Sequence, residues 1–403
     1  MKHVTIGIIG AGRAAQLHLQ ALYHVGGCRI RIKSIMALRE SQLREICNQY
    51  PAIEQYTLSF DEVIYDKEID VVDICTPPYT HLKMCTAALK AGKHVICEKP
   101  LSGYFGDPDD PRPIGHAVSK EHMYQKLVEE LEKFSETVRN SGKQFMYAEN
   151  FIYAPAIQKA AEIITARQSR ILFMKGEESL RGSTSPVAGE WDKTGGGTLI
   201  RTGIHPLSAI LWLKQIEARA HKREIWVESV LCDTGNVIST LSQSDRRHIN
   251  ATPHDVEDTA ALFLTFSDET KAVVLATDTL LGGSRNYVEA YCNDTVLQCN
   301  LTMHNAMQCY LPDDTHMQNV ELSEMTTIKT GWNNPFVADE VLRGYVAEMQ
   351  EFLMCVCENR PPLCDIKLSC DIIRTLYSGY VSAQEGRRIS VRKEDEKCGY
   401  SNN

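Results

Sequence analysis

The sequence predicts an α/β protein in which a doubly wound, parallel sheet is followed by an α+β domain with a mainly antiparallel sheet. A short apolar strand at 4–9 opens into a glycine turn and a helix, and strand and helix patterns alternate from there to residue 148. Beyond residue 151 the pattern changes to alternating strands separated by turns. We therefore expect one domain over 1–150 and a second over 151–403, which suits a chain of 403 residues at about 150 residues per domain.

The composition is that of an ordinary folded protein, with 43% hydrophobic and 24% charged residues. The 43 basic and 52 acidic residues give a net charge of −9, which argues against a general nucleic-acid or anionic-membrane binder. No apolar run approaches the roughly 18 residues of a membrane span, and the N-terminus does not resemble a signal peptide. We expect a cytoplasmic protein with neither a nucleic acid nor a membrane as its partner.

The 14 cysteines are scattered, and several lie inside apolar runs that are typical of strands (Cys75, Cys97, Cys232, Cys292). We expect them to be small buried thiols in a reducing compartment. Neither the cysteines nor the histidines show a spacing typical of metal ligands, so no metal site is expected.

The elements of the first domain follow from apolar runs and helical spacing. Pro77 and Pro100 stop two of the strands, and Gly92 ends a helix at a position where glycine is favoured. Strands are expected at 4–9, 30–38, 71–76, 94–98 and 144–148, and helices at 14–25, 41–50, 81–91 and 121–140.

The stretch 102–119 interrupts this alternation, because it is rich in Gly, Pro and Asp and has no periodicity. It directly follows a strand, so we expect a surface loop near the carboxyl edge of the parallel sheet, where ligands bind. The sequence is compatible with a tolerated insertion, with a lid and with an oligomer contact.

In the second domain, apolar and polar residues alternate within short runs, and the SDET sequence at 267–270 fits a hairpin. Two helical patterns close the chain. Strands are expected at 171–175, 225–233, 260–266, 272–280 and 287–292, and the closing helices at 339–357 and 366–386.

The first chemical motif is GAGRAA at 10–15, which joins the first strand to the first helix. Gly10 permits a tight turn, and Gly12 lets the backbone approach a pyrophosphate at the helix N-terminus. The small Ala15 allows close packing of the helix on the strand. At the first strand–helix turn of an alternating pattern, this motif favours a dinucleotide-binding site.

The ribose end of that site lacks its usual acid. Such sites often carry an acidic residue about 20 residues further on, which binds the ribose 2′-hydroxyl. Here the second strand ends in Ala37 and Leu38 instead. Arg39 suits a 2′-phosphate, whereas Glu40 is able to reach a hydroxyl, so both NAD and NADP are compatible with the sequence.

The second motif is Glu98-Lys99-Pro100 at the end of the fourth strand. A lysine at the carboxyl edge of a parallel sheet points into the cofactor crevice, and Pro100 fixes the turn that directs it. The motif is short, and its specificity comes from its register at the end of CTPPYTHLKMCTAALKAGKHVICEKP.

The run from Thr76 to Pro100 closely resembles the glucose–fructose oxidoreductase, inositol dehydrogenase and MocA (Gfo/Idh/MocA) family. The resemblance covers nearly the whole chain and includes the glycine turn, the glycine run at 195–197 before His205, and the ending SAQEGRRISV. It implies a Rossmann domain followed by a domain with a large open sheet. It also implies a tightly held nicotinamide dinucleotide, hydride transfer at a sugar or polyol carbon, and homodimers or homotetramers built on the open sheet.

By this resemblance Lys99 lies beside the nicotinamide and the reacting oxygen, and His205 in GGGTLIRTGIHPLSAI is the catalytic histidine. A hydroxyl that loses a hydride needs a base for its proton, and histidine is the usual base. A nearby ammonium stabilises the developing alkoxide. The residues expected to contact the cofactor are Gly10, Gly12, Arg13, Ala14, Ala15, Arg39, Thr76, Pro77, His81, Glu98 and Lys99.

One position departs from the family pattern. The family commonly has an aspartate four residues before this histidine, and here that residue is Arg201. A guanidinium disfavours a protonated histidine and donates hydrogen bonds. Arg201 therefore either holds a substrate hydroxyl, carbonyl or carboxylate, or turns outward.

Further substrate contacts are expected after the strand at 144–148, where the family places sugar-binding residues: Glu149, Asn150 and Tyr153. Trp191 is suited to stack on a sugar face, although Tyr153 and Trp191 are equally typical of core packing. The stretches KQFMYAENFIYAP and LIRTGIHPL resemble a bacterial branch that oxidises the 3-hydroxyl of glycosides.

The main functional expectation is an NAD(P)-dependent oxidoreductase that moves a hydride between the nicotinamide and a hydroxyl carbon of a sugar, glycoside or polyol. Oxidation of a glucoside at C3 to a 3-keto sugar is one such reaction. A redox-neutral glycosidase or epimerase that retains its NAD is the first alternative. A dinucleotide-sensing regulator without turnover is the second, and the presence of both Lys99 and His205 argues against it.

Overall fold

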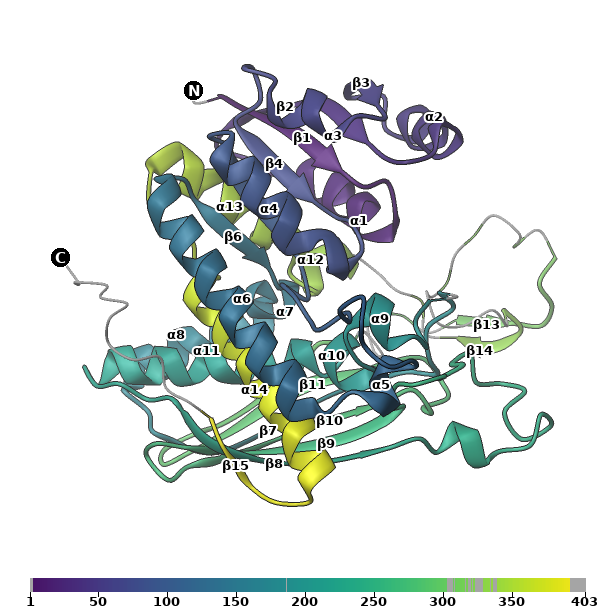
Figure 1. Ribbon diagram of the computed structural model, residues 1–403, viewed down its shortest axis with the longest axis vertical. Helices are drawn as coiled ribbons and strands as arrows, with labels where there is room; N and C mark the ends of the chain where they lie inside the picture. Colours follow the sequence, from purple (N-terminus) through teal and green to yellow (C-terminus); the bar gives the residue numbers. More distant parts are fainter. Residues whose placement is uncertain are drawn as a thin grey trace.

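The computed structural model describes residues 3–185, 187–302, 307, 309–315, 317, 320, 322, 329–333, 335 and 339–391. Most of the strands belong to two large sheets. A six-stranded parallel sheet lies at the top of Figure 1, and a seven-stranded mixed sheet lies at the bottom. Helices α6 (Lys120–Ser141) and α14 (Ile366–Glu385) pack along each other and connect the two sheets.

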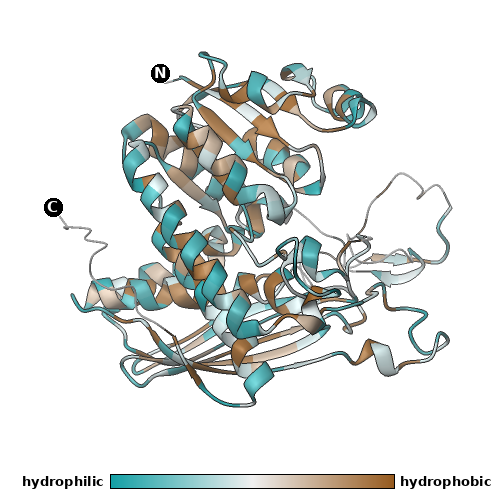
Figure 2. Cartoon of the chain, in the orientation of Figure 1, coloured by the Kyte–Doolittle hydropathy of each residue, from teal (hydrophilic) through white to brown (hydrophobic). Residues whose placement is uncertain are grey.

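The parallel sheet has the order β3-β2-β1-β4-β5-β6, so the strand order reverses between β1 and β4. In a doubly wound sheet, a dinucleotide binds in the crevice at this reversal. β1 and β4 are buried almost throughout, and Figure 2 shows the hydrophobic residues concentrated in them. The strands are β1 (His3–Ile9), β2 (Arg29–Met36), β3 (Ile53–Thr57), β4 (Val71–Ile74), β5 (His94–Glu98) and β6 (Phe145–Ala148).

Every strand and helix expected for residues 1–150 is present, with bounds that shift by a few residues. Ser119 caps the start of helix α6 by accepting a hydrogen bond from a backbone N–H, and Gly142, in the left-handed region, caps its end. The sequence prediction missed β3 and α3, because both are short and β3 is largely exposed. The helices are α1 (Arg13–Leu22), α2 (Glu40–Gln49), α3 (Phe60–Ile64), η1 (Pro78–Thr80), α4 (His81–Lys90), α5 (Ile114–Ala117) and α6.

The second sheet has the order β12-β11-β7-β10-β9-β8-β15. Its neighbouring strands are antiparallel except for β7 and β10, which run parallel, so the sheet is mixed. The parallel pair arises because the chain crosses the sheet through several helices after β7. The strands are β7 (Ile171–Ser179), β8 (Val227–Gly235), β9 (Thr259–Phe266), β10 (Lys271–Thr277), β11 (Arg285–Cys292), β12 (Val296–Asn300) and β15 (Ile389–Ser390), with a separate pair formed by β13 (Cys309–Leu311) and β14 (Gly331–Asn333).

Helices α8, α11 and α14 lie on the side of the second sheet that faces the first sheet (Figure 1). No amphipathic pattern marks α11, because it is buried on nearly every side between β7, α8 and α14. The closing helix expected over 339–357 is divided at Gly344, and its second part, α13, packs on α1 and β1. The helices are α7 (Asn150–Tyr153), α8 (Pro155–Arg167), α9 (Trp191–Thr194), α10 (Thr198–Arg201), α11 (Ile204–Ala220), η2 (Ile238–Thr240), α12 (Asp339–Leu342), α13 (Tyr345–Glu358) and α14.

The segment 102–119 is irregular apart from α5, and it is packed between the two halves of the chain. The backbone N–H of Tyr104 donates to the Tyr377 hydroxyl at 2.6 Å. A Cβ at Gly115 would lie 1.9 Å from the carbonyl oxygen of Asp255, so glycine is needed for this close approach. The segment therefore holds the second domain's loops against the first domain instead of lying loose on the surface.

No disulfide links the cysteines of the described residues, and Cys75, Cys97 and Cys232 are buried, whereas Cys292 is partly exposed. No helix in the described parts of the chain has the length and apolar character needed to cross a bilayer.

A buried ionic cluster holds α11 to the loop between β9 and β10. Lys214 and Glu217 are 2% and 0% exposed, and the Lys214 Nζ lies 2.6 Å from Glu217 Oε2 and 3.1 Å from Asp268 Oδ2. Arg223 pairs with the same two carboxylates. Because the cluster is desolvated, removing any one of these charges leaves its partners buried and uncompensated, which is costly in free energy.

Lys214→Met is therefore expected to lower the free energy of unfolding by about 3–5 kcal/mol, since it leaves buried carboxylates short of one cation. Urea unfolding followed by tryptophan fluorescence measures the change. Lys159→Met, which breaks an exposed pair with Glu162, is the control and should have little effect. Equal shifts in the two variants would contradict the prediction.

Candidate active site

The glycine turn lies at the carboxyl end of β1, beside the end of β4. Gly10 has a φ of +108°, and a Cβ there would lie 2.4 Å from the Cys75 carbonyl oxygen, so only glycine fits. A Cβ at Gly12 would meet nothing within 4 Å, and α1 begins at the next residue without a side-chain cap. The open space and the N–H groups at this helix end fit a dinucleotide pyrophosphate.

At the end of β2, Arg39 is free to contact a ligand, whereas Glu40 is bonded to neighbouring side chains. Leu38 is 88% exposed. Glu40 accepts hydrogen bonds from Arg44 and Tyr56, which lower its pKa. The Arg39 side chain is exposed and forms no hydrogen bond or ion pair within the described residues. Of the two residues considered from sequence, Arg39 is therefore the one available to a ribose substituent.

His81 connects the loops that follow β4 and β5. It is fully buried, with Nδ1 2.8 Å from the Pro100 carbonyl oxygen and Nε2 2.8 Å from the Thr76 carbonyl oxygen. Burial alone would lower the pKa of His81, but Cys97 and the two carbonyl oxygens outweigh it and raise that pKa to about 9. Although we expected His81 among the cofactor contacts, its ring is enclosed by protein and holds Thr76 and Pro100 in place. Pro77, next to Thr76, precedes η1.

Lys99 follows β5 and reaches across to the second domain. Its Nζ donates to the Arg201 carbonyl oxygen at 2.8 Å, which leaves the other ammonium protons for a ligand. Its backbone N–H donates to Glu98 Oε2 at 2.8 Å. Burial opposes ionisation of Glu98, but His18 and Lys99 outweigh burial and lower its pKa.

Behind Glu98, a buried group of side chains forms a hydrogen-bonded network. His18, Asp73 and Cys75 have possible ligand atoms within 4.8 Å of one another, although their sequence spacing did not indicate a metal site. His18 Nδ1 lies 2.9 Å from Asp73 Oδ2, and its Nε2 lies 3.2 Å from Glu98 Oε1. Since both ring nitrogens already face carboxylates, we interpret the group as a support for Glu98.

His205 lies at the start of α11 and is held on two sides. Its Nδ1 lies 2.6 Å from Glu149 Oε1, and its ring stacks on Phe151 with centroids 4.8 Å apart. A carboxylate at Nδ1 favours the tautomer in which Nδ1 carries the proton, so Nε2 is the acceptor. The Nε2 atom faces Glu178 Oε2 at 3.9 Å. This is the geometry of a general base that is oriented by a carboxylate.

Arg201 contributes its backbone and its side chain to different partners. Its carbonyl oxygen accepts the Lys99 hydrogen bond, while its guanidinium pairs with Asp278 just after β10. The sequence left open whether Arg201 holds substrate or turns away. In the structure its charge is directed to a buried carboxylate of the second domain.

The other three residues expected to bind substrate are almost fully buried. Asn150 donates to the Arg343 carbonyl oxygen at 2.8 Å, and the Tyr153 hydroxyl donates to Glu351 at 3.2 Å. The Trp191 indole N–H donates to the Tyr104 carbonyl oxygen at 3.1 Å. These contacts are those of residues that support the walls of a site.

Sequence reasoning missed Glu178, which lies on β7 with its carboxylate directed at His205. A signal was present in the sequence, because Met174, Gly176 and Glu178 share the inward register of the strand. An acidic residue in a buried register is unusual and indicates a functional or paired group.

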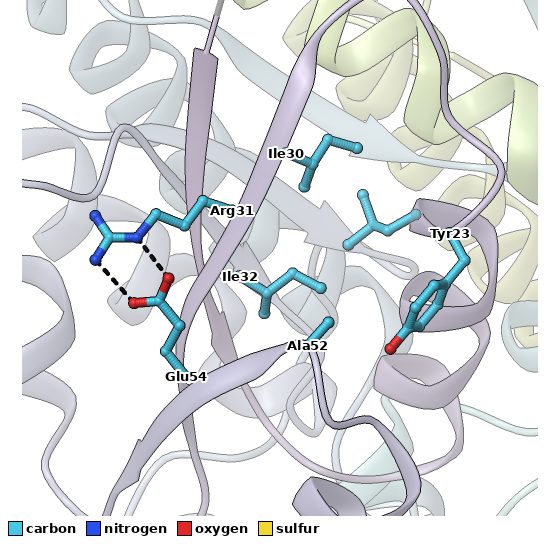
Figure 3. Close-up of a pocket in the computed structure, with 7 residues that line it drawn as sticks. Tyr23, Ile30, Arg31, Ile32, Ala52 and Glu54 are labelled. Atoms are coloured by element: carbon cyan, nitrogen blue, oxygen red, sulfur yellow. Dashed lines mark hydrogen bonds and ion pairs between the residues drawn. The ribbon is translucent and has the colours of Figure 1, made fainter.

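A shallow hollow of about 220 Å³ lies elsewhere on the first domain (Figure 3). An ion pair between Arg31 and Glu54, 2.7 Å apart, borders it. It lies near the beginnings of β2 and β3, away from the carboxyl ends where the glycine turn and Lys99 lie. The hollow is therefore separate from the candidate site. Its lining residues are Leu22, Tyr23, Ile30, Arg31, Ile32, Ala52 and Glu54.

Comparison with known proteins agrees with the fold and the glycine turn. Residues 4–122 match the family model GFO_IDH_MocA, described as an oxidoreductase family with an NAD-binding Rossmann fold. Residues 4–122 therefore form the NAD-binding Rossmann domain of this oxidoreductase family. The family resemblance expected from the sequence is thus confirmed, and so is the NAD-binding Rossmann fold.

Three curated relatives illustrate the similarity. The chain is 25% identical over 224 residues to levoglucosan dehydrogenase of Pseudarthrobacter phenanthrenivorans, covering 53% of this chain and 52% of that protein. It is 25% identical over 211 residues to D-glucoside 3-dehydrogenase of Escherichia coli, covering 52% and 53%. It is 36% identical over 104 residues to myo-inositol 2-dehydrogenase of Thermotoga maritima, covering 26% and 30%. The matches therefore span between about a third and about half of these relatives.

Two solved structures show the same fold over nearly the whole chain. GenD2 from gentamicin A biosynthesis, in complex with NAD, has a TM-score of 0.78 at 19% identity and covers 98% of this chain and 97% of its own. Levoglucosan dehydrogenase, in complex with NADH and levoglucosan, has a TM-score of 0.72 at 20% identity and covers 97% and 100%. At these identities the likeness establishes the fold.

Proposed function

We propose that this protein is an NAD(P)-dependent dehydrogenase that oxidises a hydroxyl carbon of a sugar, glycoside or polyol. The observation that carries the proposal is the pairing of His205 Nδ1 with Glu149 at 2.6 Å, beside the Lys99–Arg201 contact at the cofactor crevice. This arrangement supplies a base and an ammonium where a nicotinamide ring ends in such a fold.

The chemistry divides between the cofactor and the chain. When bound, the nicotinamide supplies the hydride acceptor. His205 Nε2 takes the proton of the reacting hydroxyl, and Glu149 stabilises the resulting imidazolium. Lys99 donates a hydrogen bond to the same oxygen and stabilises its negative charge. Arg13, Ala14 and Ala15 at the start of α1 provide the helix end for the pyrophosphate.

The substrate class is inferred from relatives and from the site. Levoglucosan, D-glucosides and myo-inositol, which name the relatives' activities, are all polyhydroxylated rings. Oxidation of a glucoside at C3 to a 3-keto sugar is one reaction of this class. Trp191, Tyr153 and Asn150 then shape the walls of the site without touching the ring, since protein groups already engage them.

Arg39 is the residue that binds the 2′-phosphate when the cofactor is NADP. Arg39→Ala is expected to weaken NADP binding about 10- to 100-fold and to leave NAD binding nearly unchanged, because only NADP offers the guanidinium a phosphate. Calorimetric titration of the protein with each nucleotide measures this. Arg44→Ala is the matched control, since Arg44 pairs with Glu40. An equal loss for both nucleotides would contradict the prediction.

The uncovered face of the second sheet suits a second copy of the chain. Leu231 and Phe263 are paired across β8 and β9 on this face, and Leu275 lies on the neighbouring strand. All three are more than a third exposed. Figure 1 shows helices α8, α11 and α14 on the side of this sheet that faces the first sheet. An apolar face of this kind is typical of a symmetric homodimer or homotetramer interface. A cytoplasmic location completes the proposal.

The test is small-molecule mass spectrometry after incubation of the purified protein with NAD or NADP and a panel of methyl glucosides, free sugars and inositols. Loss of two hydrogens from a panel member, with matching nucleotide reduction, is the expected result. Cleavage to a free sugar without net nucleotide reduction would replace the proposal with the redox-neutral glycosidase. No conversion of any panel member would count against a sugar or polyol dehydrogenase.

A further inference from the structure

Glu178 is a buried carboxylate with an unsatisfied oxygen at the candidate site. The residue is 7% exposed, and its Oε2 has no hydrogen-bond partner within the described residues. His205 Nε2 faces this oxygen at 3.9 Å, which is too far for a hydrogen bond. A buried acceptor without a donor is costly, so its retention indicates that a ligand completes it.

The two atoms that face each other here are both acceptors. Glu149 holds the Nδ1 proton of His205, so His205 Nε2 presents a lone pair, and an ionised Glu178 can only accept. One hydroxyl has one proton to donate, and the reacting hydroxyl gives that proton to His205 Nε2. A second hydroxyl is therefore needed to satisfy Glu178, and it must lie next to the first.

We propose that Glu178 accepts a hydrogen bond from the hydroxyl adjacent to the reacting carbon, so that the site selects a vicinal diol. This inference rests on the proposed function, and it deepens it by naming a specificity residue. Adjacent hydroxyls on a sugar or inositol ring are close enough to face two acceptors 3.9 Å apart.

The charged residues near Glu178 do not compete with it for a substrate hydroxyl. Arg201, four residues before His205, directs its guanidinium to Asp278 and offers no acceptor to the space beside Nε2. Burial holds the pKa of Glu178 above its usual value, and the nearby charges of His205, Lys99 and Arg343 limit that rise. The neighbouring Glu177 lies on the opposite face of β7, 3.2 Å from Arg285, and takes no part.

The experiment is a double-mutant cycle between enzyme and substrate. Steady-state kcat/KM is measured for wild type, Glu178→Leu and Glu178→Gln with a panel substrate and with its analogues deoxygenated on either side of the reacting carbon. For methyl β-D-glucoside oxidised at C3, these are the 2-deoxy and 4-deoxy forms. Glu177→Gln is the matched control on the same strand.

We expect wild type to lose about 10- to 100-fold in kcat/KM on one of the two analogues, and Glu178→Leu to lose a similar factor on the full substrate. Glu178→Leu should lose little more on that analogue, because the contact is already absent. Glu178→Gln, which keeps an acceptor oxygen, should recover part of the rate. Nucleotide binding and the unfolding midpoint should stay near wild type in all variants.

Failure of this inference differs from failure of the proposed function. If wild type oxidises no panel member, the dehydrogenase proposal fails and this inference fails with it. If wild type is active but the losses in kcat/KM from Glu178→Leu and from deoxygenation multiply for both analogues, Glu178 does not bind the adjacent hydroxyl. In that case only the inference is overturned.

Discussion

His205→Asn is expected to lower kcat by about 10²- to 10⁴-fold, which is the range supplied by a positioned general base. The reason is geometric. His205 Nδ1 lies 2.6 Å from Glu149, and the Phe151 ring stacks at 4.8 Å, so Nε2 is held toward the space beside Glu178. Asparagine keeps a donor for Glu149 but has no group at the Nε2 position that accepts a proton.

Steady-state turnover of a confirmed panel substrate measures this effect. Nucleotide affinity should remain within about twofold of wild type, because His205 lies on α11 of the second domain and not at the glycine turn. A variant that kept more than about a tenth of the wild-type kcat would show that another group accepts the proton.

Lys99→Met is expected to lower kcat by about 10²- to 10³-fold, the loss typical of removing one donor to a developing oxyanion. Methionine keeps an unbranched side chain, one atom shorter than that of lysine, and removes the charge. The Lys99 Nζ is fixed at 2.8 Å from the Arg201 carbonyl oxygen, so its remaining protons have a defined direction and little reorganisation is needed.

The matched control is Lys90→Met, since Lys90 is exposed in the last turn of α4. The control should retain wild-type turnover, and both variants should unfold at nearly the same urea concentration. Equal turnover by Lys99→Met and Lys90→Met would show that Lys99 takes no part in the reaction.

Much of the fold could be predicted because local sequence determines it. Apolar runs such as 4–9 and 94–98 mark strands that are buried on both faces, and their alternation with helices fixes a parallel sheet. Helix α11 escaped prediction because it is enclosed on nearly every side and so has no polar stripe. The parallel pairing of β7 with β10 depends on a long crossover, which no local pattern encodes.

The site was predictable in part. Lys99 was placed from its register and the family resemblance, and both Lys99 and His205 lie near Glu178 in the structure. For Trp191 the sequence left core packing and sugar stacking equally open, because Tyr104, which accepts the indole hydrogen bond, lies far along the chain. Glu178 was missed because its partner, His205, is also distant in sequence and meets it only in the folded protein.

The most direct test of the central claim uses a panel substrate that carries deuterium at every ring carbon. The protein is incubated with this substrate and unlabelled nucleotide, and the reduced nucleotide is analysed by mass spectrometry. Direct hydride transfer predicts one deuterium in each reduced nucleotide and a ketone product that has lost one. Turnover that leaves the nucleotide unlabelled, or cleavage that leaves all deuterium in the released sugar, would contradict the assignment of this site as a dehydrogenase centre.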